Sequence, residues 1–301
     1  MADLFKIIFK GGFLMRRILR NVLIIAMLIA GCILLTGCTS NENENVAGDE
    51  ATKVLRVGME CAYAPYNWAQ SDNSNGAVPI AGSTEFAYGY DVMMAKYLAE
   101  KMGYTLEVHQ IDWDSLPVAL QSNKIDCVIA GQSITAERLQ TVDFTTPYYY
   151  ASIVGLTKND SKFANVTGLV GLEGATCTSQ INTVWYDVCL PQIKNANILP
   201  AMEVASQMLV SLDSGKTELV VTDMPTAMAA TQVYKDMKIL DFTNSDDNFN
   251  VSDEEINIGI SVKKGNSELL TNLNNALATL TVEDFERMMN DAIKVQPLSN
   301  L

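Results

Sequence analysis

The residues with the clearest chemical meaning lie in the segment GQSITAER at positions 131–138. Arg138 follows Ser133 and Thr135 at the predicted start of a helix, where unpaired backbone N–H groups favour an anion. A guanidinium can hold both oxygens of a carboxylate through two parallel hydrogen bonds. Arg138 is therefore suited to bind a carboxylate, unless it only pairs with Glu137 at the surface.

Several classes of catalytic and cofactor site are excluded by residues that the sequence lacks. His109 is the single histidine, which excludes most zinc enzymes and every catalytic scheme that needs a second histidine. The sequence has no CxxC, Walker A or GxGxxG motif. Residues 246–257 begin like a calcium loop, but Val251 and Asn257 stand where that loop needs glycine and glutamate. We expect no cofactor and no metal.

Length and composition indicate a packed protein of about two domains. The chain has 301 residues, of which 48% are hydrophobic and 19% are charged, as is typical of a globular fold. The 35 acidic and 21 basic residues give a net charge of −14. Such a chain is a poor partner for nucleic acid or for an anionic membrane surface, and it suits a cationic or zwitterionic ligand better than an anion.

The first 37 residues have the pattern of a signal peptide. Five basic residues precede an apolar run that ends in LTGC at positions 35–38. This motif resembles the bacterial lipobox, in which the cysteine, here Cys38, is diacylated and becomes the mature N-terminus. Residues 38–52 are then a polar tether with nothing to bury. An uncleaved signal anchor is the alternative, and Met15 could be the true start in place of Met1.

Removal of the leader would take away five basic residues and one acid, and so leave a still more acidic chain. The protein surface would be repelled by anionic lipid, and the lipid on Cys38 would provide the attachment. We therefore expect an extracytoplasmic protein that is anchored to the cytoplasmic membrane. The remaining cysteines are expected to be free, with Cys177–Cys189 as the one disulfide worth testing. These cysteines are Cys61, Cys127, Cys177 and Cys189.

Predicted strands and helices alternate along the rest of the chain, which favours helix-covered, mostly parallel sheets. Asp91 is the predicted N-cap of the first of these helices, and Gly103 suits its end. The predicted strands cover 54–59, 105–111, 127–130, 168–172, 175–180 and 218–222. The predicted helices cover 92–102, 115–121, 203–213 and 269–280, and others start at 136, 183 and 225. In such sheets, ligands bind beyond the carboxyl ends of the strands.

Four groups of motifs, in this order and at ordinary spacing, resemble a polar amino-acid-type extracellular solute-binding protein of ABC importers. They are GMECAYAPYNW at 58–68, GYDV at 89–92, the block of DWDSL, ALQSNKID, GQSITAER, VDF and PYY within 112–149, and QINT at 180–183 with VVTDMP at 220–225. The resemblance runs from Lys53 to the C-terminus. Residues 69–88 depart from it as a longer polar insertion.

The resemblance implies a fold with two α/β lobes that are joined by two crossovers. Lobe I would comprise residues 53–150 and 258–301, and lobe II would comprise residues 151–257. Each lobe would be a helix-covered, mostly parallel sheet. A free amino acid would bind between the lobes, which would then close and dock on the permease of an ABC transporter. The ATPase subunits would take part only indirectly, and we expect a monomer.

The resemblance also assigns roles within the cleft. Arg138 would bind the ligand's carboxylate and Asp223 its ammonium, while Tyr63 and Trp113 would sandwich its side chain. Glu60 matches an acidic position after the first strand. The other expected contacts are Gly131, Gln132, Ser133, Asn182 and Thr183. Structural alternatives stay open, because Asp223 could cap the next helix, Trp113 could belong to the core, and Glu60 and Asn182–Thr183 could cap turns.

We favour a basic amino acid, arginine or lysine, as the ligand, because of Glu60, the aromatic pair and the acidic surface. A polar neutral amino acid such as glutamine or cystine is the alternative within the class. Outside that class, an enzyme similar to cyclohexadienyl dehydratases and a sensor or adhesin stay open. The enzyme is disfavoured because proton transfer would rely on carboxylates and on His109 alone.

Lipidation of Cys38 is directly testable. The membrane-bound protein should have a larger intact mass than the bare chain from Cys38 onward, and Cys38→Ser should release or mislocalise it, because the thiol is the lipid acceptor. Mass spectrometry of the membrane fraction measures the first effect and cell fractionation the second. A mature protein that still carries residues 1–37 would contradict the prediction.

Overall fold

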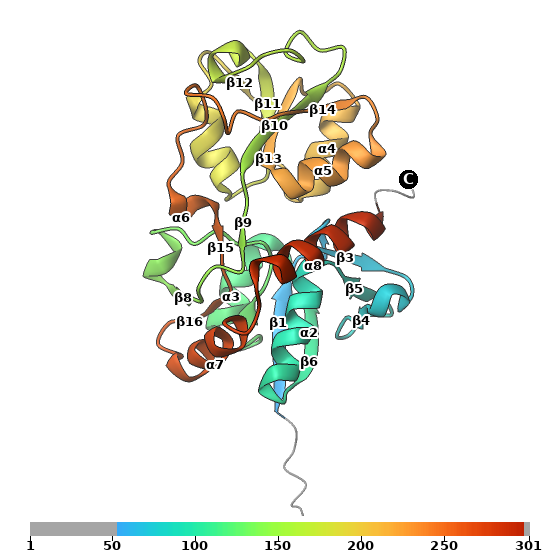
Figure 1. Cartoon of the computed structure of the whole chain (residues 1–301), viewed down its shortest axis with the longest axis vertical. Coiled ribbons are helices and arrows are strands. Elements are labelled where there is room, and N and C mark those ends of the chain that lie inside the picture. Colours follow the sequence, from blue (N-terminus) through green and yellow to red (C-terminus); the bar gives the residue numbers. More distant parts are fainter. Residues whose placement is uncertain (1–52, 298–301) are drawn as a thin grey trace, which may run out of the picture. The chain divides into compact units, whose positions relative to one another are not determined.

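The structure is a computed structural model that describes residues 53–297. The predicted signal peptide, the tether and Cys38 lie outside the described residues. Within these, the chain forms an α/β fold with two lobes, each built around a five-stranded sheet (Figure 1). None of the helices in the described part combines the length and the apolar composition that a membrane crossing needs.

The sheet of lobe I has the strand order β6-β1-β7-β16-β8. β1 (Val54–Met59) runs parallel to β6 (Thr105–Gln110) and β7 (Cys127–Val128), as strand–helix–strand crossovers require. β16 (Ser261–Lys263) comes late in the chain and inserts antiparallel between β7 and β8 (Val142–Phe144). Lobe I is therefore completed by a segment that follows lobe II in the sequence.

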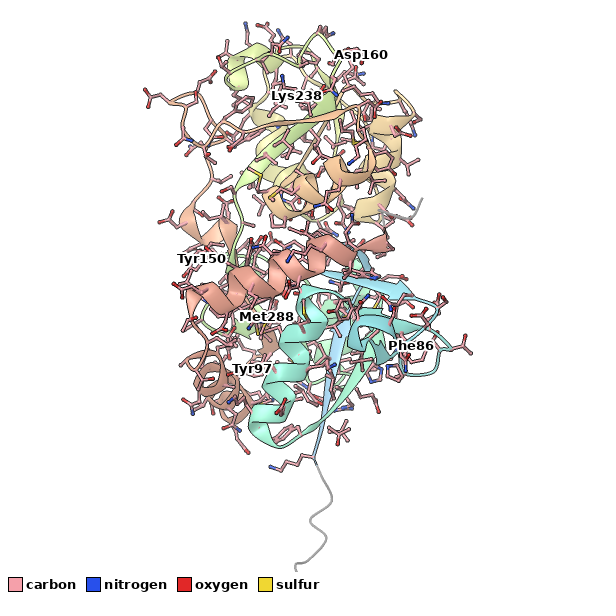
Figure 2. All side chains as sticks on the ribbon, turned by 45° about the vertical axis from the view of Figure 1, so that its right-hand side comes forward. Phe86, Tyr97, Tyr150, Asp160, Lys238 and Met288 are labelled. Atoms are coloured by element: carbon pink, nitrogen blue, oxygen red, sulfur yellow. The ribbon has the colours of Figure 1, made fainter. Side chains whose placement is uncertain are left out.

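The helices of lobe I pack against this sheet and against one another. α2 contacts β6, α7 and α8, and α3 contacts β1. Their bounds are α2 (Tyr90–Met102), α3 (Leu116–Gln121), α7 (Ser267–Leu277) and α8 (Val282–Val295). The buried face of α2 repeats apolar side chains at helical spacing, such as Val92, Ala95 and Ala99. Met288 of α8 is buried as well, whereas Tyr150, at the end of the first stretch of lobe I, is exposed (Figure 2).

The polar insertion and the segment before it together form a small antiparallel sheet with the strand order β2-β3-β5-β4. These strands are β2 (Ala62–Tyr63), β3 (Asn67–Gln70), β4 (Val78–Pro79) and β5 (Phe86–Tyr88). Trp68 and Tyr88 stand opposite each other and their rings meet edge to face, 5.4 Å apart. Trp68 is thus a packed residue of this sheet, with its indole N–H bonded to Gln70 at 3.1 Å.

The sheet of lobe II has the strand order β12-β11-β13-β10-β14. β11 (Thr176–Thr178) is parallel to β12 (Asn197–Ile198) and to β13 (Leu219–Asp223). β10 (Ile153–Lys158) is antiparallel to β13 and to β14 (Met237–Leu240). Both β10 and β13 are buried along nearly their whole length, because α4 (Ala205–Asp213) and α5 (Met224–Val233) pack against them.

Two chain segments cross between the lobes side by side. β9 (Tyr149–Tyr150) pairs antiparallel with β15 (Asn257–Ile258). α6 (Asp253–Ile256) precedes β15 and starts with a capping box, in which Ser252 and Glu255 satisfy each other's backbone N–H groups. We propose this two-stranded ladder as the hinge and the boundary between lobe I (53–150 and 258–297) and lobe II (151–257).

Several predicted elements were wrong. Residues 168–172 form a short 3₁₀ helix at Leu169–Leu172, and β10 and β14 were not predicted. Residues after 136 form only a 3₁₀ turn at Arg138–Gln140, because β8 begins at Val142 and leaves no room for an α-helix. The helix expected from residue 183 is a π-helical turn at Trp185–Cys189 that continues as 3₁₀. The long amphipathic α8 was also missed.

The prediction for Asp91 was wrong in an informative way. Gly89 holds the N-cap position of α2 with φ of 126°, and Asp91 lies inside the first turn with no exposed surface. A side chain at position 89 would collide with the backbone of Tyr66, so only glycine fits there. The four cysteines of the described part are buried, and none of them forms a disulfide in this structure.

Candidate functional site

The predicted site residues stand where strands end. Glu60 follows β1 and Gly131–Ser133 follow β7, and these two parallel strands end at the same edge of the lobe I sheet. In lobe II, Thr183 follows β11 and Asp223 ends β13, which are also parallel neighbours. The fold therefore presents both sets at the carboxyl ends of strands, as the sequence predicted for a ligand site of this kind of sheet.

A small inner pocket brings most of the predicted residues together. Its lining consists of Glu60, Tyr63, Trp113, Gly131, Ser133, Arg138, Gln180, Thr183, Val184 and Trp185. Its volume is about 20 Å³, enough for roughly one water molecule. An amino acid can enter only if the lobes separate or these side chains move. Gln180, Val184 and Trp185 were not predicted as site residues. QINT includes Gln180 and so carried a signal for it, whereas nothing in the sequence marked Trp185.

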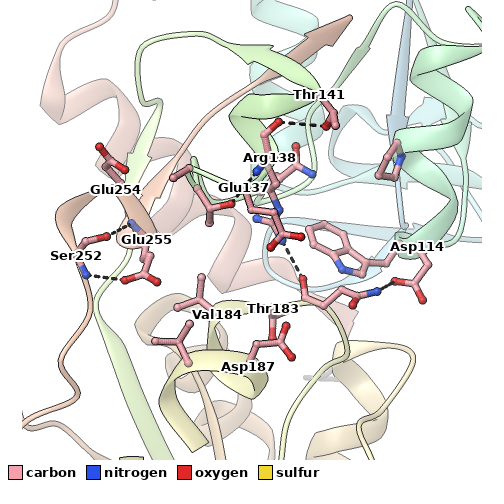
Figure 3. Close-up of a pocket in the computed structure, with 17 residues that line it drawn as sticks. Asp114, Glu137, Arg138, Thr141, Thr183, Val184, Asp187, Ser252, Glu254 and Glu255 are labelled. Atoms are coloured by element: carbon pink, nitrogen blue, oxygen red, sulfur yellow. Dashed lines mark hydrogen bonds between the residues drawn. The ribbon is translucent and has the colours of Figure 1, made fainter. Parts of the chain in front are cut away.

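A larger outer cavity of about 620 Å³ is also lined by Arg138 (Figure 3). It shares Trp113, Arg138 and Thr183 with the inner pocket, and it adds Gln132 and Asn182 of the predicted set. Its remaining lining includes five acids, namely Asp114, Glu137, Asp187, Glu254 and Glu255, and no lysine. Its net charge is therefore negative, which attracts cations towards the inner pocket.

The described hydrogen bonds of Arg138 go to neutral groups, while the carboxylates of Glu137 and Asp187 act on it through charge alone. One terminal nitrogen donates to the backbone carbonyl of Ser133 and the other to that of Asn182, each at 2.9 Å. The guanidinium carbon lies 5.4 Å from the ring centre of Trp113. Burial lowers the pKa of Arg138 to about 10. Among the described ion pairs none involves Arg138, so the alternative of a surface pair with Glu137 is not observed. A carboxylate would be a stronger acceptor for both nitrogens than these carbonyls.

Asp223 is both a helix cap and a buried acid of the site. One of its oxygens accepts from the backbone N–H of Thr226 at 2.8 Å, which caps α5. The other accepts from the hydroxyl of Tyr63, across the two lobes. Asp223 is only 2% exposed, and burial raises its pKa. It lines neither of the two cavities, so an ammonium group would reach it by displacing the Tyr63 hydroxyl.

Glu60 is the least satisfied acid of the inner pocket. It is 4% exposed, and its described hydrogen bonds come from a single amide nitrogen, that of Gln180, at 3.2 and 3.3 Å. Burial raises its pKa to about 7, and the nearby carboxylates of Asp112 and Asp114 act in the same direction. No lysine or arginine pairs with it in the described chain. A cationic group beside Glu60 would lower its pKa again and so favour the ionised carboxylate.

Other aromatic residues support the site from behind. Tyr63 stacks on Tyr66 with ring centres 4.6 Å apart, and it meets Trp185 of lobe II edge to face at 6.0 Å. Tyr66 itself is completely buried, so it belongs to the core. His109 is half-buried in β6, where its Nε2 lies 2.6 Å from a carboxylate oxygen of Glu107, and it does not line the inner pocket. No cluster in residues 53–297 could hold a metal ion.

Comparisons with known proteins agree with this geometry. The sequence model of bacterial extracellular solute-binding proteins, family 3, matches residues 55–290. The arginine-binding extracellular protein ArtP of Bacillus subtilis is 34% identical over 160 residues, which span 52% of this chain and 55% of that protein. The ABC transporter arginine-binding protein 1 of Escherichia coli is 27% identical over 263 residues, which span 81% of this chain and 92% of that protein.

A solved structure supports both the fold and the relationship. An ancestral arginine-binding protein bound to arginine superposes with a TM-score of 0.61 at 31% identity. The superposition covers 79% of this chain and 97% of that one. The predicted resemblance and the two-lobed α/β fold are confirmed by these matches together.

The buried acids predict an unusual dependence of stability on pH. Glu60 binds its proton more tightly when folded, with a pKa of about 7 against 4.5, so the native state holds more protons between these values. The ligand-free protein should therefore lose stability as pH rises from 5 to 8, with Glu60 contributing on the order of 2–3 kcal/mol. Asp91 and Asp223, whose pKa values are also raised, act in the same direction.

Denaturant unfolding at pH 5 and pH 8 measures this effect, on protein that has been refolded to remove bound amino acids. Glu60→Gln should flatten the pH dependence by the share of Glu60. Glu268→Gln is the matched control, because its side chain is 80% exposed on the same lobe. Equal slopes for wild type and Glu60→Gln would contradict the assignment.

Proposed function

The chain belongs to family 3 of the bacterial extracellular solute-binding proteins, and we propose that it captures a free basic amino acid, arginine or lysine, for an ABC transporter. The single observation that carries the choice of ligand is the buried carboxylate of Glu60, which has an amide and no cation beside it. The names of the relatives in Bacillus subtilis and Escherichia coli support the same ligand class.

The two charged ends of an amino acid match two groups of the site. Arg138 is half-buried, and its terminal nitrogens donate to backbone carbonyls. A ligand carboxylate would take the place of these carbonyls and accept charge-assisted hydrogen bonds. Asp223 is buried beneath the Tyr63 hydroxyl, and an ammonium group would provide the opposite charge that this carboxylate lacks. These two residues come from different lobes, so a single ligand would be held by both.

The side chain of the ligand would extend towards Glu60. A long apolar stem could lie between Tyr63 and Trp113, with Trp185 at its edge, and its cationic end would face the carboxylate. The acids around the outer cavity would raise the local concentration of such a cation at low ionic strength. A neutral side chain such as that of glutamine would leave Glu60 without a charge partner.

Ligand capture would be a hinge motion about the ladder of β9 and β15. Because the ligand touches both lobes, its binding would favour the closed arrangement, which the permease would then recognise. Cys38 would carry the lipid that keeps the protein at the outer face of the cytoplasmic membrane, and the protein would act as a monomer. Its role would be binding without turnover, which an assay with arogenate or prephenate would check.

Arg138→Ala should abolish ligand binding without unfolding the protein. Loss of one partner from a buried, charge-assisted contact costs about 2–5 kcal/mol. Calorimetric titration with arginine measures the affinity, and circular dichroism checks the fold. Arg287→Ala is the matched control, because that side chain is exposed on α8 and its described ion pair is with Asp284. An affinity change of less than about threefold for Arg138→Ala would count against the proposed carboxylate contact.

Glu60→Gln should weaken the binding of arginine and lysine by on the order of 2 kcal/mol, since it removes a charged hydrogen-bond acceptor. It should leave the binding of glutamine unchanged or improve it. Titration of wild type and variant with arginine, lysine, histidine, glutamine and cystine measures both effects, with Glu268→Gln as control. Arginine affinity of the wild type should also rise from pH 6 to pH 8 as Glu60 ionises.

A wild-type protein that ignores all three basic amino acids but binds a neutral one would refute the basic ligand and keep the binding function. Binding of none of the twenty amino acids would refute the proposed function altogether.

A further inference from the structure

A buried carboxylate lies behind the inner pocket without lining it. Asp91 has no exposed surface, and each of its oxygens accepts one short hydrogen bond. Asn67 donates its amide N–H at 2.7 Å, and Tyr148 donates its hydroxyl at 2.6 Å. Burial raises the pKa of Asp91 to about 6, while both bonds oppose that rise, so the carboxylate is ionised at pH 8.

The same two residues, Asn67 and Tyr148, also accept hydrogen bonds from backbone N–H groups of the site. The amide oxygen of Asn67 accepts from the N–H of Cys61 at 2.7 Å, and the hydroxyl oxygen of Tyr148 accepts from the N–H of Gly131 at 3.1 Å. Cys61 comes directly after Glu60, and Gly131 opens the segment that leads to Arg138. Asp91 is thus linked to two loops. The Cys61 arm runs through Asn67 to the loop after β1, and the Gly131 arm runs through Tyr148 to the loop after β7.

The two anchored residues share a demanding backbone conformation. Cys61 has φ of 56° and Gly131 has φ of 61°, both in the left-handed region. That region costs a non-glycine residue on the order of 1 kcal/mol or more, and it persists where surrounding structure fixes it. A side chain at position 131 would collide with the ring of Tyr63, so this loop also sets the position of that ring.

We propose that Asp91 is a positioning residue of the ligand site, which fixes the loops of Glu60 and of Gly131 through Asn67 and Tyr148. The proposal rests on the proposed function, because it takes amino-acid binding as its readout. Asp91 touches no ligand in this scheme. It holds the loop of Glu60 and the loop that contacts Tyr63 at a fixed separation. A shift of either loop would lower the affinity for the ligand.

The polarity of the Asn67–Asp91 contact permits a swap test. In Asp91→Asn an amide would face the amide of Asn67, and in Asn67→Asp two carboxylates would face each other. In the double variant, the amide at position 91 donates to the carboxylate at position 67. The other oxygen of that carboxylate still accepts from Cys61, and the amide oxygen at 91 still accepts from Tyr148. The double variant therefore restores the chain of hydrogen bonds, and the negative charge lies at position 67 instead of position 91.

The measurement is calorimetric titration at pH 8 with L-arginine, or with the neutral amino acid that wild type binds in its place. It is made well below the lowest melting temperature of the set. Each single variant should weaken binding at least roughly tenfold. The double variant should return to within about threefold of wild type. A purely structural role for Asp91 would lower the melting temperature and leave the affinity of the folded protein unchanged.

Asp126→Asn is the matched control. It makes the same change in the same lobe and breaks the bond of Asp126 to Arg56 in β1, away from the pocket. It should lower stability and keep affinity. Should Asp91→Asn fail to fold, Tyr148→Phe decides, because it removes only the Gly131 arm and should still weaken binding.

Unchanged affinity in Asp91→Asn, or in Tyr148→Phe where the former does not fold, would overturn the proposal, as would a double variant no better than the singles. A wild type that binds no free amino acid would overturn the proposed function itself and this inference with it.

Discussion

Three carboxylates are withdrawn from water near the pocket, and no lysine or arginine pairs with any of them in the described chain. Glu60, Asp91 and Asp223 are each at most 4% exposed. Burial of an ionised carboxylate without a cation is costly, and neutral donors offset only part of that cost. The raised pKa values of all three groups express this cost directly. The arrangement of the site follows from how each acid is partly satisfied.

The donors divide the three acids into two kinds. Asp91 is bonded by Asn67 and Tyr148, both of its own lobe, so it keeps its partners whether or not the lobes meet. Glu60 of lobe I is bonded by Gln180 of lobe II, and Asp223 of lobe II is bonded by Tyr63 of lobe I. Separation of the lobes would return these two acids to water. Such acids can exchange a neutral donor for a cationic ligand, whereas Asp91 keeps its two hydrogen bonds within lobe I.

Arg138, the cationic residue of the site, also forms its hydrogen bonds partly across the two lobes. Arg138 of lobe I donates to the backbone of Asn182 in lobe II, and the side chain of Asn182 donates back to Asp114 at 2.7 Å. Asn182 has φ of 54°, so this loop too is held in a left-handed conformation. These polar contacts between the lobes are ones that a zwitterionic ligand could replace. The inner pocket is small for this reason: protein groups satisfy one another there. Elsewhere the lobes also pack directly, because α4 contacts β2 and α5 contacts α8.

The sequence by itself determined the fold family, and it named most of the residues that line the inner pocket, because the motifs around Glu60 and Arg138 stand at fixed places after strands. Local patterns found β1, α2 and α5, whose apolar spacing or capping is readable within one turn. They missed β10, β14 and α8, since the partners that bury these segments lie far away in the sequence. The role of Asp91 was misread as a cap for the same reason. Its partners, Asn67 and Tyr148, are 24 and 57 residues away, and only tertiary packing brings a carboxylate, an amide and a phenol within hydrogen-bonding distance.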